Sequence, residues 1–338
     1  MVFELTDGLA ACPAERWNTL SICISNLLVG YYEGNLAIVA SGALCRWMQN
    51  RHLVDGPRES IALNHLLNNN AYRPNVLWNI RVVLENPDFN NHELGIDFFN
   101  TTESALPSSM LCENLDDIRF YMKQTRHYYP DSPMAVTRWH GGGGTTVDVF
   151  KTLKKRNLFC LVILDSDIKY PGCPVGDTAS RCVSNYRVPV PNLLVKVLPV
   201  HEAENLVPLS FLMRNTRPDG VRFLRRLQKR NMVDKLVFYD IKDGITKEKT
   251  EEFPDYKVFA SELFEGLNPR NRNGFDAYYS LKTNLTDYVY PQINPNMLSL
   301  FIGDGSRSYE VDVMEVYRRE IADLVYTFVC CRGNDPIN

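Results

Sequence analysis

The chain has 338 residues, of which 45% are hydrophobic and 23% are charged. This composition excludes long disorder, and the length predicts two or three folding units. The net charge of −3 excludes a global basic field, so any contact with nucleic acid must come from a local basic patch.

Cysteine usage and hydropathy indicate where the protein works. Nine cysteines are scattered without a C-x-x-C pair, which argues against structural zinc and favours a reducing, cytoplasmic compartment. Glu4 and Asp7 stand where a signal peptide would be basic. The most apolar stretch, 20–44, is interrupted by polar residues, so it predicts buried helices and no membrane span.

Three consecutive regions are expected along the chain. Apolar residues at helical spacing predict a mostly helical N-terminal region over 1–106. Strand-like and helical runs alternate over 107–215, which predicts an α/β domain with a parallel sheet. An α+β C-terminal region over 216–338 should hold a basic helix, a short strand at 235–239 and a terminal helix at 309–329.

The middle region is the most regular. Its expected strands are 110–113, 134–139, 158–164 and 193–198, and its expected helices are 116–127 and 145–155. The run 158–164 is continuously apolar, as in a strand that is buried on both faces.

Acidic residues follow two of these strands and a glycine turn follows a third. Glu113 ends the first strand, the turn 141–144 follows the second, and Asp165 and Asp167 follow the third. Open parallel sheets place their sites along this edge. Residues i and i+2 of an extended segment face the same side, so both aspartates could bind one ion. Hard oxygen ligands select Mg²⁺ or Mn²⁺ over zinc.

Each of these features also has an ordinary structural explanation. An isolated Asp-x-Asp is a common loop, a glycine run is a common turn, and a lone Glu at a strand end commonly stabilises a helix N-terminus. Their combination in this order favours a metal site.

The opening of the middle region resembles TOPRIM domains. The segment 110–121, Met-Leu-Cys-Glu-Asn-Leu-Asp-Asp-Ile-Arg-Phe-Tyr, matches the family's first strand and helix, with an Asp four residues after the strand-end Glu. Glu113 and Asp117 match this pattern, whereas Asn114 replaces the usual Gly.

Later motifs extend the resemblance over 108–212. Gly142 and Gly143 match the glycine turn after the second strand, and 161–167 matches the Asp-x-Asp motif after the third. The segment 201–206, His-Glu-Ala-Glu-Asn-Leu, is similar to the Glu-Asn motif of TOPRIM nucleases related to the overcoming-lysogenization-defect (OLD) family.

The resemblance implies a catalytic metal centre, with His201 orienting a ligand or touching phosphate and Asp117 capping or orienting. The implied catalytic and metal-binding residues are Glu113, Asp165, Asp167 and Glu204, with Glu202 as the less favoured further ligand. Alternatively, both glutamates form an acidic first turn and His201 flanks that helix.

A basic segment follows the resemblance. Apolar residues interleave with its cations, so a helix would have a basic face that could track a phosphate backbone; the alternative is a solvated face. Its candidate substrate-binding residues are Arg222, Arg225, Arg226, Lys229 and Arg230.

The resemblance implies an Mg²⁺- or Mn²⁺-dependent endonuclease that cleaves DNA or RNA, tRNA included. Small proteins of this kind act in bacterial anti-phage systems, often with an ABC-type ATPase, so nucleic acid and such an ATPase are the expected partners. A homo-oligomer is compatible with the sequence. One alternative is a non-catalytic TOPRIM scaffold that binds an ATPase or nucleic acid. Another is a primase-like or topoisomerase-like activity, but the sequence has no tyrosine-nucleophile context or primase zinc motif that would support it.

Overall fold

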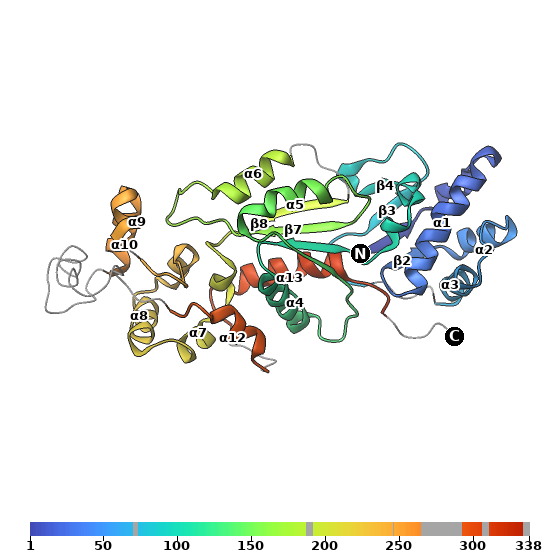
Figure 1. The fold of residues 1–338 in the computed structure, drawn as a ribbon. Coiled ribbons are helices and arrows are strands. Elements are labelled where there is room, and N and C mark those ends of the chain that lie inside the picture. The colour runs from blue at the N-terminus through green and yellow to red at the C-terminus, as the bar shows by residue number, and fades with distance from the viewer. Residues whose placement is uncertain (70–73, 187–191, 246, 265–292, 306–310, 334–338) are drawn as a thin grey trace, which may run out of the picture. The chain divides into compact units, whose positions relative to one another are not determined.

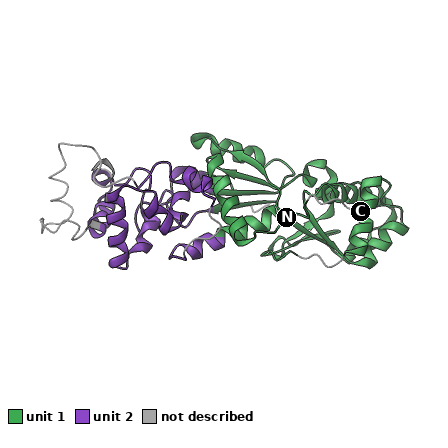
Figure 2. Cartoon of the chain, turned by 90° about the horizontal axis from the view of Figure 1, so that it is seen from below, with its two compact units in different colours: residues 1–163, 182–196, 321–338 green, residues 164–181, 197–320 purple. Residues whose placement is uncertain are grey.

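The computed structural model describes residues 1–69, 74–186, 192–245, 247–264, 293–305 and 311–333 (Figure 1). The chain divides into two compact units (Figure 2). Unit 1 comprises residues 1–163, 182–196 and 321–338, and unit 2 comprises residues 164–181 and 197–320. The three consecutive regions expected from the sequence stay a prediction, because compactness alone does not show which segments fold by themselves.

The N-terminal part of unit 1 contains a four-stranded parallel sheet. Its strands are β1 (Val2–Leu5), β2 (Ala37–Ala40), β3 (Ile80–Val83) and β4 (Glu93–Gly95), in the order β2-β1-β3-β4. The helices of this part are α1 (Trp17–Tyr32), α2 (Gly42–Asn50) and α3 (Pro57–Asn68). The expected helices are present, but the helical periodicity gave no sign of this sheet, so the region is α/β.

A second sheet follows, with strands close to those expected. They are β5 (Ser109–Cys112), β6 (Thr137–His140), β7 (Cys160–Leu164) and β8 (Leu193–Val197), in the order β6-β5-β7-β8. β5 pairs in parallel with both β6 and β7. The crossover helices α4 (Leu115–Tyr128) and α5 (Thr146–Leu153) cover opposite faces of this sheet (Figure 1), as right-handed connections to opposite neighbours of β5 require. The predicted α/β class is therefore confirmed.

The glycine turn after β6 needs its glycines for conformational reasons. Gly142 and Gly143 have φ values of +68° and +65°, a region that side chains with a Cβ rarely adopt. The Gly142 N–H donates to the Glu113 carbonyl at 3.0 Å, which ties this turn to the end of β5.

Four phenylalanines form an aromatic cluster in the core of unit 1. Phe159 comes directly before β7, and its ring centroid lies 4.9 Å from that of Phe3 in β1. Phe98 and Phe99 also contact Phe159, at 5.1 and 6.1 Å. The cluster therefore connects the first sheet to the second.

Unit 2 is built from helices and long connections. It contains η7 (Ala203–Leu206), α7 (Leu209–Arg214), α8 (Pro218–Lys229), η8 (Val233–Phe238), α9 (Lys247–Glu252), α10 (Pro254–Phe264) and α12 (Met297–Gly303). The strand expected at 235–239 is wrong, because these residues lie in and just after the 3-10 helix η8. The described residues of 216–338 contain helices and a single bridge at Cys330 but no strand, and the α+β expectation for the whole region stays a prediction.

The remaining helices are short 3-10 helices or span a boundary between the two units in the sequence. They are α6 (Asp177–Asn185), α13 (Glu315–Val329), η1 (Asp7–Ala11), η2 (Ala14–Arg16), η3 (Phe89–Asn91), η4 (Ile96–Asn100), η5 (Thr102–Ala105) and η6 (Gly143–Thr145). Of the terminal helix expected at 309–329, residues 309 and 310 lie outside the described residues. In the described parts of the chain, no helix has both the length and the apolar character for crossing a membrane.

Phe159→Ala should lower the free energy of unfolding of unit 1 by about 3–5 kcal/mol, because it leaves a cavity among the rings of Phe3, Phe98 and Phe99. Urea unfolding followed by circular dichroism measures this change. Phe89→Ala is the control, because Phe89 is 50% exposed. Equal losses for both variants would contradict a role for the cluster in joining the two sheets.

Candidate metal centre

The loop after β7 is fastened to the segment after β8 by three hydrogen bonds. The Asp165 carboxylate accepts from the Ala203 N–H at 3.1 Å. The Ser166 hydroxyl donates to the Val200 carbonyl, and the Asp167 N–H donates to the His201 carbonyl at 3.0 Å. These bonds bring the Asp-x-Asp and His-Glu-Ala-Glu-Asn motifs together within unit 2.

Asp167 departs from the extended conformation that the sequence predicts. Its φ is +54°, in the left-handed region, so the alternation of an extended segment does not apply to it. Asp165 holds a backbone N–H, whereas Asp167 is exposed and lines a pocket. The expectation that an extended segment aligns both carboxylates on one ion is therefore wrong.

His201 is buried with its ring orientation fixed. Its Nδ1 lies 3.0 Å from the Ile168 carbonyl oxygen, which can only accept a hydrogen bond, so Nδ1 carries a proton. Its Nε2 lies 3.7 Å from a carboxylate oxygen of Asp240. If the ring is neutral, Nε2 presents a lone pair toward this carboxylate. The pair thus requires a cation between its members or a second proton on the ring.

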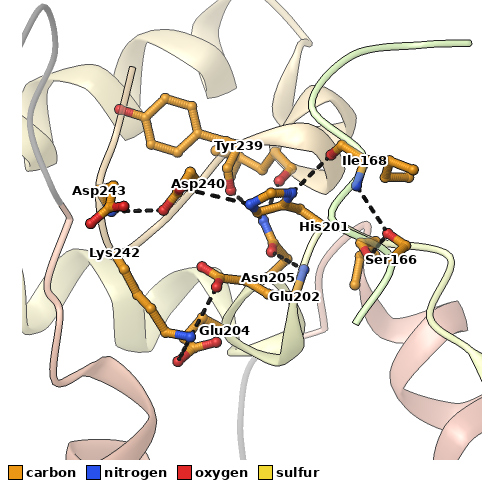
Figure 3. A network of polar contacts seen from close by, with 12 residues as sticks. Ser166, Ile168, His201, Glu202, Glu204, Asn205, Tyr239, Asp240, Lys242 and Asp243 are labelled. Carbon is orange, nitrogen blue, oxygen red and sulfur yellow. Dashed lines mark hydrogen bonds and ion pairs between the residues drawn. The ribbon is translucent and has the colours of Figure 1, made fainter. Parts of the chain in front are cut away.

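Two glutamates in and before η7 share one lysine (Figure 3). The Lys242 Nζ lies 2.9 Å from Glu202 Oε2 and 2.9 Å from Glu204 Oε1. Both carboxylates are buried, at 7% and 3% exposure. They occupy the N-cap and first turn of η7, as the structural alternative expected, yet they are withdrawn from solvent.

Asn205 holds the backbone around these glutamates. Its Oδ1 accepts from the Glu202 N–H at 2.9 Å, and its side-chain amide donates to the Leu236 and Tyr239 carbonyls at 2.6 and 2.7 Å. The last two bonds connect η7 to η8 and the residue after it, and so fix the segment that carries Asp240 and Lys242.

The crowded charges shift the ionisation of the cluster. Burial raises the pKa of Glu202 to about 7, and the neighbouring Glu204 carboxylate adds to the rise, against the opposing effect of Lys242. Burial lowers the pKa of His201, but the facing Asp240 carboxylate and the nearby Glu202 and Asp167 carboxylates outweigh that effect and raise it. Burial likewise opposes the Lys242 ammonium, yet Glu202 and Glu204 raise its pKa well above the ordinary range.

His201, Glu202, Asp240 and Lys242 form a polar cluster that opens into a pocket of about 510 Å³. Five carboxylates line it, those of Asp167, Asp177, Glu202, Asp240 and Asp243, against the ammonium groups of Lys169 and Lys242. Part of the wall is apolar and includes Phe253. A cavity with this excess of negative charge attracts cations.

His201, Glu202 and Asp240 have the arrangement of metal ligands. One ligand atom from each lies within 4.8 Å of the others, and all three residues are buried. The Glu202 Oε1 atom is buried and has no hydrogen-bond partner among the described residues. A metal-bound histidine commonly donates its second ring N–H to a backbone carbonyl, as His201 does to Ile168. One imidazole and two carboxylates therefore fit a divalent ion, and the imidazole favours Mn²⁺ over Mg²⁺.

The remaining residues of the predicted site lie in unit 1. Glu113 follows β5 and is half-buried, and the glycine turn hydrogen-bonds to its carbonyl. Asp117 is buried in α4, where its carboxylate accepts from the Asn114 N–H at 2.9 Å, so it has the expected geometry of a helix cap. These residues belong to unit 1, whereas His201, Glu202, Asp240 and Lys242 belong to unit 2.

The predicted basic helix is present as α8. Its apolar side chains, Phe223, Leu224 and Leu227, are buried. Arg222, Arg225 and Lys229 are exposed on the helix, whereas Arg226 and Arg230 are half-buried. Arg230 also donates to the Glu262 carbonyl at 3.1 Å. Three of the five cations are thus fully available to a polyanion.

Two residues of the cluster escaped the sequence analysis. Asp240 and Lys242 directly follow a short apolar run, 236–239. The rule that selected Glu113 and Asp165, acidic residues directly after an apolar run, would also have selected Asp240. No sequence motif indicates that Lys242 contacts Glu202 and Glu204, which lie about forty residues earlier.

Glu202→Gln should change stability in a pH-dependent way. Since the pKa of Glu202 is raised from 4.5 to about 7 in the folded state, the folded chain binds more protons between these values and loses stability as the pH rises through them. The glutamine variant, which cannot ionise, should gain about 2 kcal/mol over the wild type between pH 5 and pH 8. Urea unfolding in EDTA at both pH values measures this. A constant difference would show that Glu202 ionises without penalty.

Comparison with known proteins supplies no relative. No protein-family model, curated protein or solved structure matches this chain. The chemistry of the cluster around His201 is therefore the ground on which a function can be proposed.

Proposed function

We propose that this protein is a divalent-metal-dependent phosphodiester hydrolase, a nuclease, whose metal centre includes His201, Glu202 and Asp240. The observation that carries the proposal is the convergence of these three buried side chains within 4.8 Å, beside the unpartnered Glu202 Oε1 atom. Ordinary core residues would not leave such groups facing each other in a buried site. A divalent ion would neutralise the carboxylates, activate a water molecule and stabilise the leaving oxygen of a phosphodiester.

The residues of the chain would hold and orient this reaction. Ile168 fixes the His201 ring through its carbonyl, so the Nε2 atom faces the Asp240 carboxylate. Asp167 lies on the same pocket and is exposed, which suits it to receive a proton from an attacking water or to join the ligand set. The Asp165 carboxylate holds the Ala203 N–H and so positions the Glu-Asn motif.

The walls of the pocket suit a nucleotide. Phe253 offers an aromatic surface for a base. The carboxylates would repel a phosphodiester unless a cation stands between them, so substrate binding should depend on the metal. The exposed cations of α8 would add contacts to the phosphate backbone that do not depend on base sequence.

The wider setting of the proposal comes from the TOPRIM resemblance. The order β6-β5-β7-β8 is compatible with a TOPRIM-like sheet. In that setting Glu204 would belong to the catalytic set, and Glu113, Gly142 and Gly143 stay predicted site residues of unit 1. The protein would act in the cytoplasm as an anti-phage effector on DNA or RNA, under the control of an ABC-type ATPase. Nine free cysteines, eight of them buried, suit a reducing compartment.

Asp240→Asn and His201→Gln should each lower the cleavage rate by about 100-fold or more, because each removes a metal ligand. Cleavage of single-stranded and double-stranded DNA, messenger RNA and tRNA with Mn²⁺ or Mg²⁺ would measure this. Asp148→Asn is the matched control, because its side chain is 75% exposed on α5. Wild-type rates in both cluster variants, or Mn²⁺ binding without cleavage of any substrate, would contradict the proposal.

Reversing Arg222 and Arg225 to glutamate should weaken nucleic-acid binding without changing sequence preference. The slope of log affinity against log salt should fall by about 0.9 for each duplex phosphate contact that is lost. Fluorescence anisotropy between 50 and 300 mM salt measures the slope. Reversal of the exposed Arg58 of α3 is the control. Equal salt slopes in the wild type, the α8 variant and the Arg58 variant would show that the cations of α8 are solvated and do not contact phosphates.

A further inference from the structure

A lysine ammonium lies between two of the buried carboxylates. Two-metal nucleases hold two ions about 3.5–4 Å apart between shared carboxylates, and the resemblance implies that Glu204 serves such a second ion. Here Lys242 Nζ lies 2.9 Å from both Glu202 Oε2 and Glu204 Oε1. We propose that this ammonium fills the second cation position, so that the centre binds one divalent ion and not two. The inference rests on the proposed metal centre.

The geometry gives Glu202 a role at both positions. Its Oε2 atom binds the ammonium, and its Oε1 atom has no partner among the described residues. A ligand atom of Glu202 also lies within 4.8 Å of those of His201 and Asp240. Glu202 therefore bridges the ammonium to the proposed metal position, as a shared carboxylate bridges two ions in a two-metal site.

The ammonium is anchored by the backbone around it. Ile241 is fully buried, and its carbonyl accepts from the Ile293 N–H at 3.0 Å. Its neighbours on either side, Asp240 and Lys242, both line the pocket. This anchored backbone segment thus presents one proposed metal ligand, Asp240, and one cation, Lys242, to the same cavity.

This arrangement has two consequences for chemistry. A lysine is a point charge that donates hydrogen bonds but cannot activate water as a metal ion does. Lys242 would therefore neutralise Glu202 and Glu204 and bind a phosphate oxygen, while the single ion at His201 supplies the activated water. The positive charge of Lys242 also lies beside the metal position, so it should weaken the affinity of that ion.

The test is the stoichiometry and affinity of Mn²⁺ binding to the full chain, by calorimetry and by the electron paramagnetic resonance of free Mn²⁺. The wild type should bind one ion at this centre. Lys242→Met should bind two, with the first about tenfold tighter, because it frees two carboxylate oxygens and removes a repelling charge. Lys242→Arg, which keeps the charge, should still bind one.

A second variant keeps the test decisive if Lys242→Met does not fold. Glu204→Gln should retain its single ion, since Glu204 binds the lysine and not the metal. Two ions in the wild type, an unchanged single ion in Lys242→Met, or loss of Mn²⁺ from Glu204→Gln would each overturn the inference and leave the metal centre intact. Absence of Mn²⁺ binding from the wild type, Lys242→Met and Glu204→Gln alike would instead overturn the proposed function.

Discussion

Burial of like charges is the constraint on which the site depends. His201, Glu202, Glu204 and Asp240 are all buried, and the Lys242 ammonium lies 2.9 Å from a carboxylate oxygen of Glu202 and of Glu204. Buried charges are tolerated when they are paired or when they bind a metal ion. Lys242 pairs with Glu202 and Glu204, while the His201 ring faces the Asp240 carboxylate at 3.7 Å. The proposed divalent ion would neutralise the negative charge that these pairings leave.

The fold positions these charges through connections and not through regular elements. Three hydrogen bonds fasten the loop after β7 to the segment after β8, and Asn205 joins that segment to the η8 helix. The residues of the proposed metal centre lie in loops or at the start of a 3-10 helix, where the backbone is free to bring them together. Such a site requires an unbroken hydrogen-bond network, because no strand pairing fixes it.

The sequence predicted the second sheet well and the first sheet poorly. The apolar run at 158–164 begins two residues before β7 and ends at the same residue, because a strand buried on both faces must be continuously apolar. β1 and β2 have four residues each and lie on either side of the 16-residue helix α1, so helical periodicity dominated the sequence pattern there. Asp167, His201 and Glu202, all candidate site residues from the sequence, line one pocket, while their chemical roles stay predictions. Asp240 and Lys242 were missed, because an apparent strand at 235–239 is a 3-10 helix and nothing local links it to η7.

The position of a bound ion tests the central claim most directly. Crystals grown with Mn²⁺ and measured at the manganese absorption edge would locate the ion by anomalous scattering. The account predicts a peak within bonding distance of His201 Nε2 and of the Glu202 and Asp240 carboxylates, with the Lys242 ammonium still between Glu202 and Glu204. A peak elsewhere in the chain, or none at saturating Mn²⁺, would contradict it.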